Sequence, residues 1–191
     1  MPTWGRRYVG LILKNHANYW GTGDWLAYFG TYRPWGIHRQ HGGTKVDYPA
    51  HSGRILDLKE GNADAIAAFQ AQIEPELPDD IAIAVVPGHD PAKPGKGLLA
   101  LAAVLASKGD RTDASSVLVR TEKITKLASG GDRSEEVHAK SVKVVNANLI
   151  KGKDVLLLDD VAKTGNSLRA CQKLLLASGA RSVECATIGK T

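Results

Sequence analysis

This 191-residue sequence has few cysteines and few long apolar runs. Its aromatic residues are scarce beyond the first third of the chain. Its two cysteines, Cys171 and Cys185, are too few for a disulfide framework or a zinc cluster, and both lie in apolar segments typical of reduced, buried thiols. The longest low-charge stretch, residues 97–107, is about half of the roughly 20 residues that a membrane span requires. No apolar run with a small-residue cleavage site follows the N-terminus, so we expect no signal peptide, no membrane partner and a cytoplasmic protein.

The aromatic residues gather at the front of the chain. All four Trp and all five Tyr lie in the first 48 residues, and nothing aromatic follows Phe69. This front segment shows neither helical nor alternating periodicity, apart from a strand-like run at residues 8–13. We therefore interpret residues 1–61 as an irregular, aromatic-rich subdomain and residues 62–191 as a separate core.

From residue 62 onward, helical and strand-like segments alternate. The spacing of apolar residues predicts helices at residues 62–73, 97–107 and 166–178. Short aliphatic runs predict strands at residues 81–86, 116–120, 141–145, 155–158 and 182–188. The polar, glycine-containing residues 121–140 predict a long loop. The alternation indicates an α/β fold with a doubly wound, mostly parallel sheet. Ligands of such sheets bind where strands end, and here the qualifying turns follow Val86, Arg120 and Leu158.

One of these turns carries the residues with recognisable chemistry. Four aliphatic residues are followed by two acids and then by a glycine with two hydroxyl residues, namely Asp159, Asp160, Thr164, Gly165 and Ser167. A glycine turn that opens a helix exposes amide groups that bind phosphate. Two acids would repel a bare phosphate, but they suit a ligand that also carries hydroxyls or a divalent cation. A sugar phosphate meets both conditions. The alternative, a structural strand–turn–helix with solvated acids, does not explain why these residue types fall together.

This segment resembles the phosphoribosyl pyrophosphate (PRPP) signature of type I phosphoribosyltransferases: aliphatic residues, two acids, a short spacer, Thr-Gly and a small hydroxyl residue. The resemblance extends over roughly residues 80–191. It implies that Asp159 and Asp160 are catalytic residues that contact the ribose hydroxyls, and that they hold Mg²⁺ through water or those hydroxyls. It also implies a 5′-phosphate site at Ala162, Lys163, Thr164, Gly165, Asn166 and Ser167.

The resemblance also implies a site for the pyrophosphate group of PRPP. The turn after the first core strand implies a pyrophosphate site at Pro87, Gly88 and His89. In this family a mobile loop closes over the site, which implies residues 121–140, with Lys123, Lys126 and Arg133 as candidate cations for the leaving group. We expect Lys126 to bind pyrophosphate and Arg133 to be catalytic, because two glycines before Arg133 supply a hinge. A solvated loop is the alternative. His138 is expected to be structural or to face solvent.

The implied activity is a Mg²⁺-dependent transfer of ribose 5-phosphate from PRPP to a base, amine or nucleotide-like acceptor, with release of pyrophosphate. In this family a variable hood recognises the acceptor, and here residues 1–61 would form it. Tyr32 and Trp35 would stack on a planar acceptor, unless they only form an aromatic core. Lys163 stands where 6-oxopurine enzymes have Asp. An ammonium ion cannot handle the proton of the base, which argues against hypoxanthine–guanine salvage.

The C-terminal part is also similar to amidophosphoribosyltransferases and to ComF-like proteins, through Arg120, Lys126, Arg133 and the Gly152-Lys153 pair. ComF-like proteins often carry cysteine zinc ligands at the front, which this chain lacks. This similarity implies an alternative function, a PRPP-sensing or nucleic-acid-handling protein that has lost transfer. The net charge of +5 and the basic, aromatic front segment support it, although +5 suits an anionic small molecule equally well. Nucleic acid is thus the less favoured partner, and the family leaves a homodimer open.

Overall fold

The computed structural model describes residues 12–13, 18–20, 25–92, 95–124 and 134–191. Its main sheet has six strands in the order β1-β2-β8-β7-β3-β4. They are β1 (Tyr19–Trp20), β2 (Leu26–Tyr28), β8 (Ser182–Lys190), β7 (Asp154–Ala162), β3 (Ala82–Val85) and β4 (Thr112–Asp113). β1 pairs antiparallel with β2 at one edge, and all other neighbours pair in parallel. The predicted doubly wound, mostly parallel sheet is confirmed.

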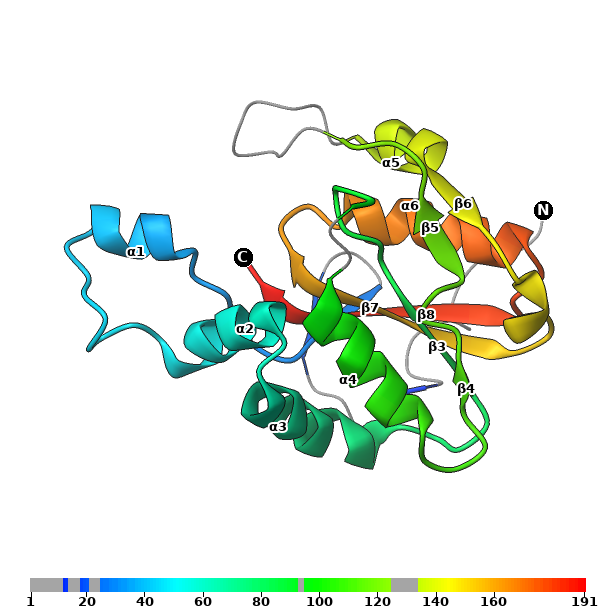
Figure 1. Cartoon of the computed structure of the whole chain (residues 1–191), viewed down its shortest axis with the longest axis horizontal. Helices are drawn as coiled ribbons and strands as arrows, with labels where there is room; N and C mark the ends of the chain where they lie inside the picture. The colour runs from blue at the N-terminus through cyan, green and yellow to red at the C-terminus, as the bar shows by residue number, and fades with distance from the viewer. Residues whose placement is uncertain (1–11, 14–17, 21–24, 93–94, 125–133) are drawn as a thin grey trace.

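Helices cover both faces of the sheet (Figure 1). One face carries α2 (Ala50–Glu60), α3 (Ala63–Ile73) and α4 (Lys96–Ala106), and the other carries α5 (Glu135–Ser141) and α6 (Asn166–Ala177). Each face has its own apolar core, because successive side chains of a strand point to opposite faces. In β7, Leu156 and Leu158 belong to the core under α2, α3 and α4, and Val155 and Leu157 to the core under α6.

The central position of β7 explains its aliphatic run and places the acids that follow it. β7 lies between β3 and β8, where both faces are buried, and such strands are continuously hydrophobic. Leu158 pairs with Val85 on one side and with Ala186 on the other. The strand continues through Asp159 and Asp160, beyond the predicted aliphatic segment. The two acids therefore lie at the carboxyl end of the sheet, beside the turn that leaves β3.

The N-terminal part of the chain contributes to the main sheet. β2 pairs in parallel with β8, and α1 (Trp35–Gln40) and α2 are helices that the sequence analysis did not predict. α2 lies so close to α4 that a Cβ atom on Gly97 would be 1.5 Å from the carbonyl oxygen of Leu58. Of the predicted strand at residues 8–13, residues 8–11 lie outside the described part, and Ile12 and Leu13 form a bend. The division at residue 61 into hood and core remains a prediction.

Two further segments differ from expectation. Residues 135–141, predicted as loop, form α5, whose first turn is capped by the Ser134 hydroxyl accepting from the amide of Val137. The predicted strand at residues 116–120 is present as β5 (Leu118–Arg120), but it pairs antiparallel with β6 (Val142–Val144) in a separate two-stranded sheet. Arg120 therefore does not end a strand of the main sheet. Among the described residues, 3-10 helices also occur at Glu74–Glu76 and Ala147–Leu149. Within the described ranges, no helix has the length and apolar character needed to cross a bilayer.

Candidate active site

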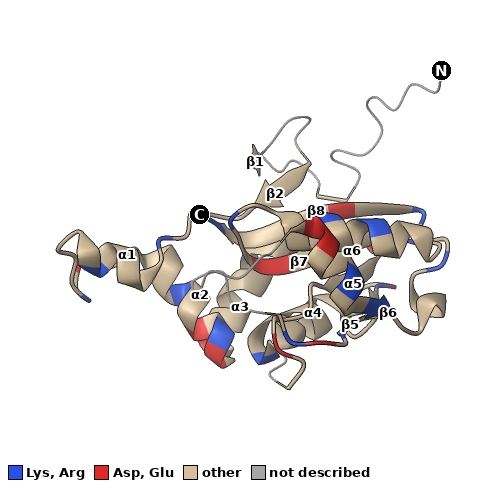
Figure 2. Ribbon diagram, turned by 90° about the horizontal axis from the view of Figure 1, so that it is seen from above, with Lys and Arg blue, Asp and Glu red and all other residues tan. Residues whose placement is uncertain are grey.

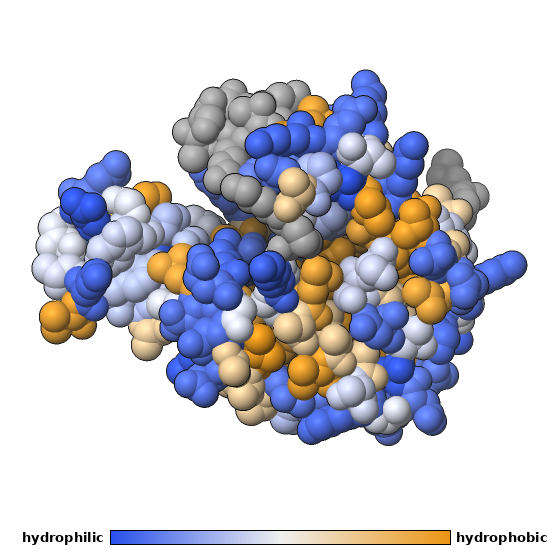
Figure 3. All heavy atoms as spheres, viewed as in Figure 1, coloured by the Kyte–Doolittle hydropathy of each residue, from blue (hydrophilic) through white to orange (hydrophobic). Residues whose placement is uncertain are grey.

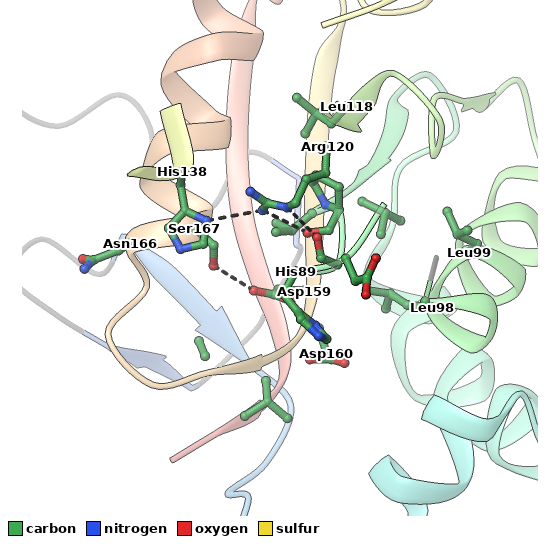
Figure 4. Close-up of a pocket in the computed structure, with 18 of the residues that line it drawn as sticks. His89, Leu98, Leu99, Leu118, Arg120, His138, Asp159, Asp160, Asn166 and Ser167 are labelled. Atoms are coloured by element: carbon green, nitrogen blue, oxygen red, sulfur yellow. Dashed lines mark hydrogen bonds between the residues drawn. The ribbon is translucent and has the colours of Figure 1, made fainter. Parts of the chain in front are cut away.

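A cavity of about 890 Å³ opens at the carboxyl ends of β3 and β7 (Figure 4). Its walls come from the loop after β3, the start of α4, β5, α5 and the turn between β7 and α6. The predicted residues that line it are Asp159, Asp160, the turn at residues 162–167, and Pro87, Gly88 and His89. The α4 side of the cavity is apolar, through Leu98 and Leu99, and apolar side chains are also exposed over this region in the space-filling view (Figure 3). One cavity thus holds both predicted half-sites.

The two acids differ in their contacts, although they are adjacent in β7. Asp159 accepts hydrogen bonds from the amide of Asp160 at 2.9 Å and from the Ser167 hydroxyl at 3.2 Å. Asp160 forms an ion pair with Lys59, whose Nζ lies 3.0 Å from Oδ2. Burial, together with the charge of Asp160, raises the pKa of Asp159 to about 7. The pair is therefore costly to ionise fully, and it favours ligands that supply hydroxyl donors or a cation.

The turn between β7 and α6 has the geometry of an anion site. Gly165 adopts φ +77°, a left-handed conformation that favours glycine, and α6 begins at the next residue. The first amides of a helix have no partner within the helix, and the helix dipole adds positive potential there. Thr164 is exposed at the cavity wall, and Ser167 reaches back to Asp159. The loop between β7 and α6 thus offers amide and hydroxyl donors a few residues after the two acids.

The loop after β3 is tied to Arg120 at the end of β5 and to Lys123 just after it. Val86 donates its amide to the carbonyl of Leu158 at 2.9 Å, and the chain then leaves the sheet. The Arg120 guanidinium donates to the carbonyls of Pro87 and Gly88. Farther along, Asp90 forms an ion pair with Lys123 at 2.9 Å. The predicted pyrophosphate loop is therefore anchored on its outer side by basic residues of the β5 region.

The predicted acceptor residues lie apart from this cavity. Within the described part of the chain, its lining includes neither Tyr32 nor Trp35. Trp35 packs edge-on against Tyr48, with ring centroids 5.0 Å apart, and borders a shallower hollow of about 280 Å³. Tyr32 is half-buried, and the Nζ of Lys59 lies 6.0 Å from its ring centroid. Two further predictions, Lys126 and Arg133, fall outside the described residues.

Lys59, Arg120 and His138 also line the cavity, although the sequence did not assign them to the site. Lys59 comes from α2, and nothing in its local sequence signals contact with Asp160. Arg120 was predicted to precede one of the ligand-binding turns and to be part of a family pattern, but no role in the site was assigned to it. His138 was expected to be structural or solvent-facing; it is buried, lies within 3.3 Å of Arg120, and also lines the cavity. Figure 2 shows the acidic band on β7, with basic residues on α2 and α5.

Comparison with known proteins identifies the core. Residues 100–190 match the family described as phosphoribosyl transferase domain. This stretch, a little under half of the chain, is therefore similar to a phosphoribosyl transferase domain. The match includes both acids and the whole β7–α6 turn, whereas the loop at residues 87–89 lies before it. No curated protein matches the sequence. None of the comparisons supports the narrower similarity to ComF-like proteins.

Several solved structures are similar to this chain. Hypoxanthine phosphoribosyltransferase from Staphylococcus aureus is 17% identical, with 78% of this chain and 69% of that chain covered and a TM-score of 0.41. Purine phosphoribosyltransferase from Pyrococcus horikoshii Ot3 is 15% identical, with 85% and 88% covered and a TM-score of 0.37. Phosphoribosylpyrophosphate synthetase from Mycobacterium smegmatis is 19% identical, with 70% and 33% covered and a TM-score of 0.35.

The two acids at the end of β7 suit magnesium only together with a substrate. Among the described residues, no cluster of three or more His, Cys, Asp or Glu side chains could hold a metal by itself. Mg²⁺ is commonly bound through one or two carboxylates, with water and substrate phosphates completing its shell. Asp159 and Asp160, both at the cavity wall, fit that donor set.

Proposed function

We propose that this protein transfers the ribose 5-phosphate group of PRPP to a small-molecule acceptor and releases pyrophosphate, with Mg²⁺ as cofactor. The observation that carries the proposal is that one cavity holds a pair of acids, a helix-opening glycine turn and a second loop tied to a buried arginine. These three parts match the hydroxyls, the 5′-phosphate and the pyrophosphate of PRPP. The family match over residues 100–190 supports the same reaction class.

In the proposed reaction, the bond between ribose C1 and the pyrophosphate oxygen breaks, and its electron pair leaves with pyrophosphate. A lone pair of the acceptor forms the new bond at C1, and the acceptor then loses its proton. Positive charge builds up on the ribose in such a transition state. Asp159 and Asp160 would orient the ring through its hydroxyls, and the turn at Gly165 would fix the 5′-phosphate. When bound, Mg²⁺ supplies positive charge to the departing pyrophosphate. Most of the catalysis is therefore positioning and charge neutralisation.

The acceptor is a base, amine or nucleotide-like compound in this proposal. Lys163 is exposed at the cavity wall, and as a cation it suits an acceptor or phosphate with negative charge. A proton-handling acid at that position would have favoured a 6-oxopurine. Tyr32 and Trp35 remain predicted acceptor contacts, and Lys126 and Arg133 remain predicted contacts of the leaving group. A cytoplasmic location and a homodimer stay predictions as well.

Calorimetric titration of PRPP with Mg²⁺ tests the proposal. The double variant Asp159→Asn, Asp160→Asn should bind PRPP about 100-fold or more weakly, because each lost charge-assisted hydrogen bond costs about 1.5–3 kcal/mol. Asp154→Asn is the matched control, since Asp154 also lies on β7 but at its amino end, paired with Arg181. Both variants should keep the circular dichroism of the native protein. Unchanged PRPP affinity in the double variant would overturn the proposal.

An acceptor screen that reads pyrophosphate release then tests transfer itself. Release that requires PRPP, Mg²⁺ and one class of acceptor supports the enzyme. Binding of PRPP without release for any acceptor, combined with salt-dependent affinity for single-stranded oligonucleotides, would favour the sensing or nucleic-acid-handling alternative.

A further inference from the structure

Arg120 occupies an unusual position for an arginine. It ends β5 and is only 3% exposed, although burial of a guanidinium is unfavourable unless its donors are satisfied. Its Nε donates to the carbonyl of Gly88, and its Nη2 donates to the carbonyl of Pro87 at 3.2 Å. Its Nη1 donates to the hydroxyl of Ser141 at 2.6 Å. The planar fork of this side chain therefore joins the loop after β3 to the end of α5.

The hydrogen bonds of Arg120 determine which way the loop presents its peptide groups. Two successive carbonyls, those of Pro87 and Gly88, point toward Arg120, which binds both, and the next carbonyl, that of His89, accepts from the amide of Ile124 at 3.0 Å. No cis peptide occurs in the described part of the chain, so each following N–H points away from the carbonyl before it. The amides of Gly88 and His89, which follow the two carbonyls that Arg120 binds, thus face away from Arg120, and successive amides turned to one side form an anion-binding concavity.

His138 completes the support on the side of α5. Its Nδ1 lies 3.3 Å from Nη2 of Arg120. A guanidinium can only donate, so Nδ1 accepts and the proton of the neutral ring is on Nε2. Arg120 and His138 both reach the cavity wall, as Figure 4 shows for their side chains. The positive charge of Arg120 therefore lies on the side of the loop to which the carbonyls of Pro87 and Gly88 point, and it also borders the cavity.

We propose that Arg120 is the positioning residue of the pyrophosphate half-site: it holds the carbonyls of Pro87 and Gly88 away from the ligand, so that the loop presents amide donors to the diphosphate. This inference rests on the proposed function. It assigns Arg120 to one half of the substrate only, because the hydrogen bonds described for Arg120 join the β3 loop to α5, whereas the 5′-phosphate turn follows β7. A role in general folding would affect both halves alike.

Separate titrations of inorganic pyrophosphate and of ribose 5-phosphate, each with Mg²⁺, distinguish these roles. Arg120→Met should weaken pyrophosphate binding at least 10-fold and leave ribose 5-phosphate binding within 2-fold of the native protein. Arg120→Lys keeps a positive charge but has no planar fork, so it should also lose most of the pyrophosphate affinity. Ser141→Ala removes one support of the guanidinium and leaves both loop carbonyls bound, so its effect on pyrophosphate should be smaller than that of Arg120→Lys.

Arg111→Met is the matched control. The side chain of Arg111 is also only 3% exposed, and it also donates to backbone carbonyls, those of Pro78, Leu105 and Leu77, but it lies just before β4 at the amino end of the sheet. Its loss should change neither titration. Equal weakening of both ligands by Arg120→Lys, or full pyrophosphate affinity in that variant, would overturn the inference. If Arg120→Met does not fold, the comparison of Arg120→Lys with Ser141→Ala decides the question. A native protein that binds neither ligand would instead contradict the proposed function.

Discussion

Replacing Asp159 by Asn should stabilise the ligand-free protein at neutral and alkaline pH, although it removes a group that the proposed reaction needs. Asp159 lies next to Asp160 at the end of β7, and burial together with that neighbouring charge raises its pKa to about 7. Ionising Asp159 in the folded protein is therefore unfavourable. An amide at this position carries no charge. It would still accept from the amide of Asp160 through its oxygen and donate to the Ser167 hydroxyl through its nitrogen.

The size of the effect follows from linkage between proton binding and folding. An aspartate in the unfolded chain titrates near 3.8, whereas folded Asp159 titrates near 7. Between these values the folded state binds the proton and the unfolded state does not. Stability should therefore fall as the pH rises from about 4 to about 7 and level off above that. The upper limit of this loss is about 4 kcal/mol, and solvent screening of the partly exposed carboxyl reduces it to about 2 kcal/mol. Asp159→Asn should be more stable than the native protein by about that amount at pH 8.

Urea unfolding at pH 5, 6, 7 and 8, with a chelator present, measures how the free energy of unfolding depends on pH in the native protein and in Asp159→Asn. The native protein should lose stability across this series, and Asp159→Asn should lose much less. Asp154→Asn should be less stable than the native protein, because the hydrogen bond from Arg181 holds the pKa of Asp154 below its usual value and so stabilises the folded state when Asp154 is ionised. Its removal should lower stability throughout this range. A native protein whose stability is flat from pH 5 to pH 8, or an Asp159→Asn variant less stable than native at pH 8, would refute the reasoning.

Two further predictions concern how the N-terminal part is attached. Gly97→Ala should destabilise the protein by about 3 kcal/mol or more in urea unfolding, because the new Cβ would overlap the carbonyl oxygen of Leu58, whereas Gly36→Ala has open space in α1 and should be neutral or slightly stabilising. Glu184→Leu should cost about 2–4 kcal/mol and expose the chain before β1 to limited proteolysis, since the buried carboxylate accepts the amides of Ile12 and Leu13 at 3.0 and 3.2 Å. Native-like stability of Gly97→Ala would contradict the close packing of α4 on α2. Unchanged proteolysis of Glu184→Leu would contradict the role of the Glu184 carboxylate in holding Ile12 and Leu13.

The parts of this fold that could be predicted are those whose signal is local. α3, α4 and α6 have apolar residues at helical spacing, and β3, β7 and β8 are short aliphatic runs, so each could be found from its own residues. The turn between β7 and α6 was equally accessible, because its acids, glycine and hydroxyls all fall between Asp159 and Ser167. These residues meet in space because they are neighbours in sequence. No long-range information was needed to place them together.

The missed parts depend on contacts between distant segments. α2 buries Ser52, Ile55 and Leu58, of which only two are apolar, so its apolar pattern is too short to predict a helix. It is held by packing on α4 and β8. β2 is three residues long and gains its place from pairing with β8. The strand β5 could be predicted from its own residues, but its partner could not. Nothing in its local sequence indicates whether it pairs with the edge of the main sheet or with β6. In α5, the Ser134 cap and two following glutamates were a usable signal that polar composition obscured.

The distribution of charge in the cavity argues for one orientation of the proposed substrate. Asp159 and Asp160 lie at the end of β7, the amide-rich turn at Gly165 follows them, and the buried Arg120 supports the loop on the β3 side. A phosphate laid on the two carboxylates would meet like charge in a partly buried site, which is unfavourable. A ring of hydroxyls laid there would donate hydrogen bonds to the same oxygens. A ligand with hydroxyls in its middle, one phosphate at one end and a diphosphate at the other therefore fits with its pentose over β7. The permanent charge of Arg120 beside the loop favours the more highly charged diphosphate there, which leaves the single phosphate for the turn at Gly165.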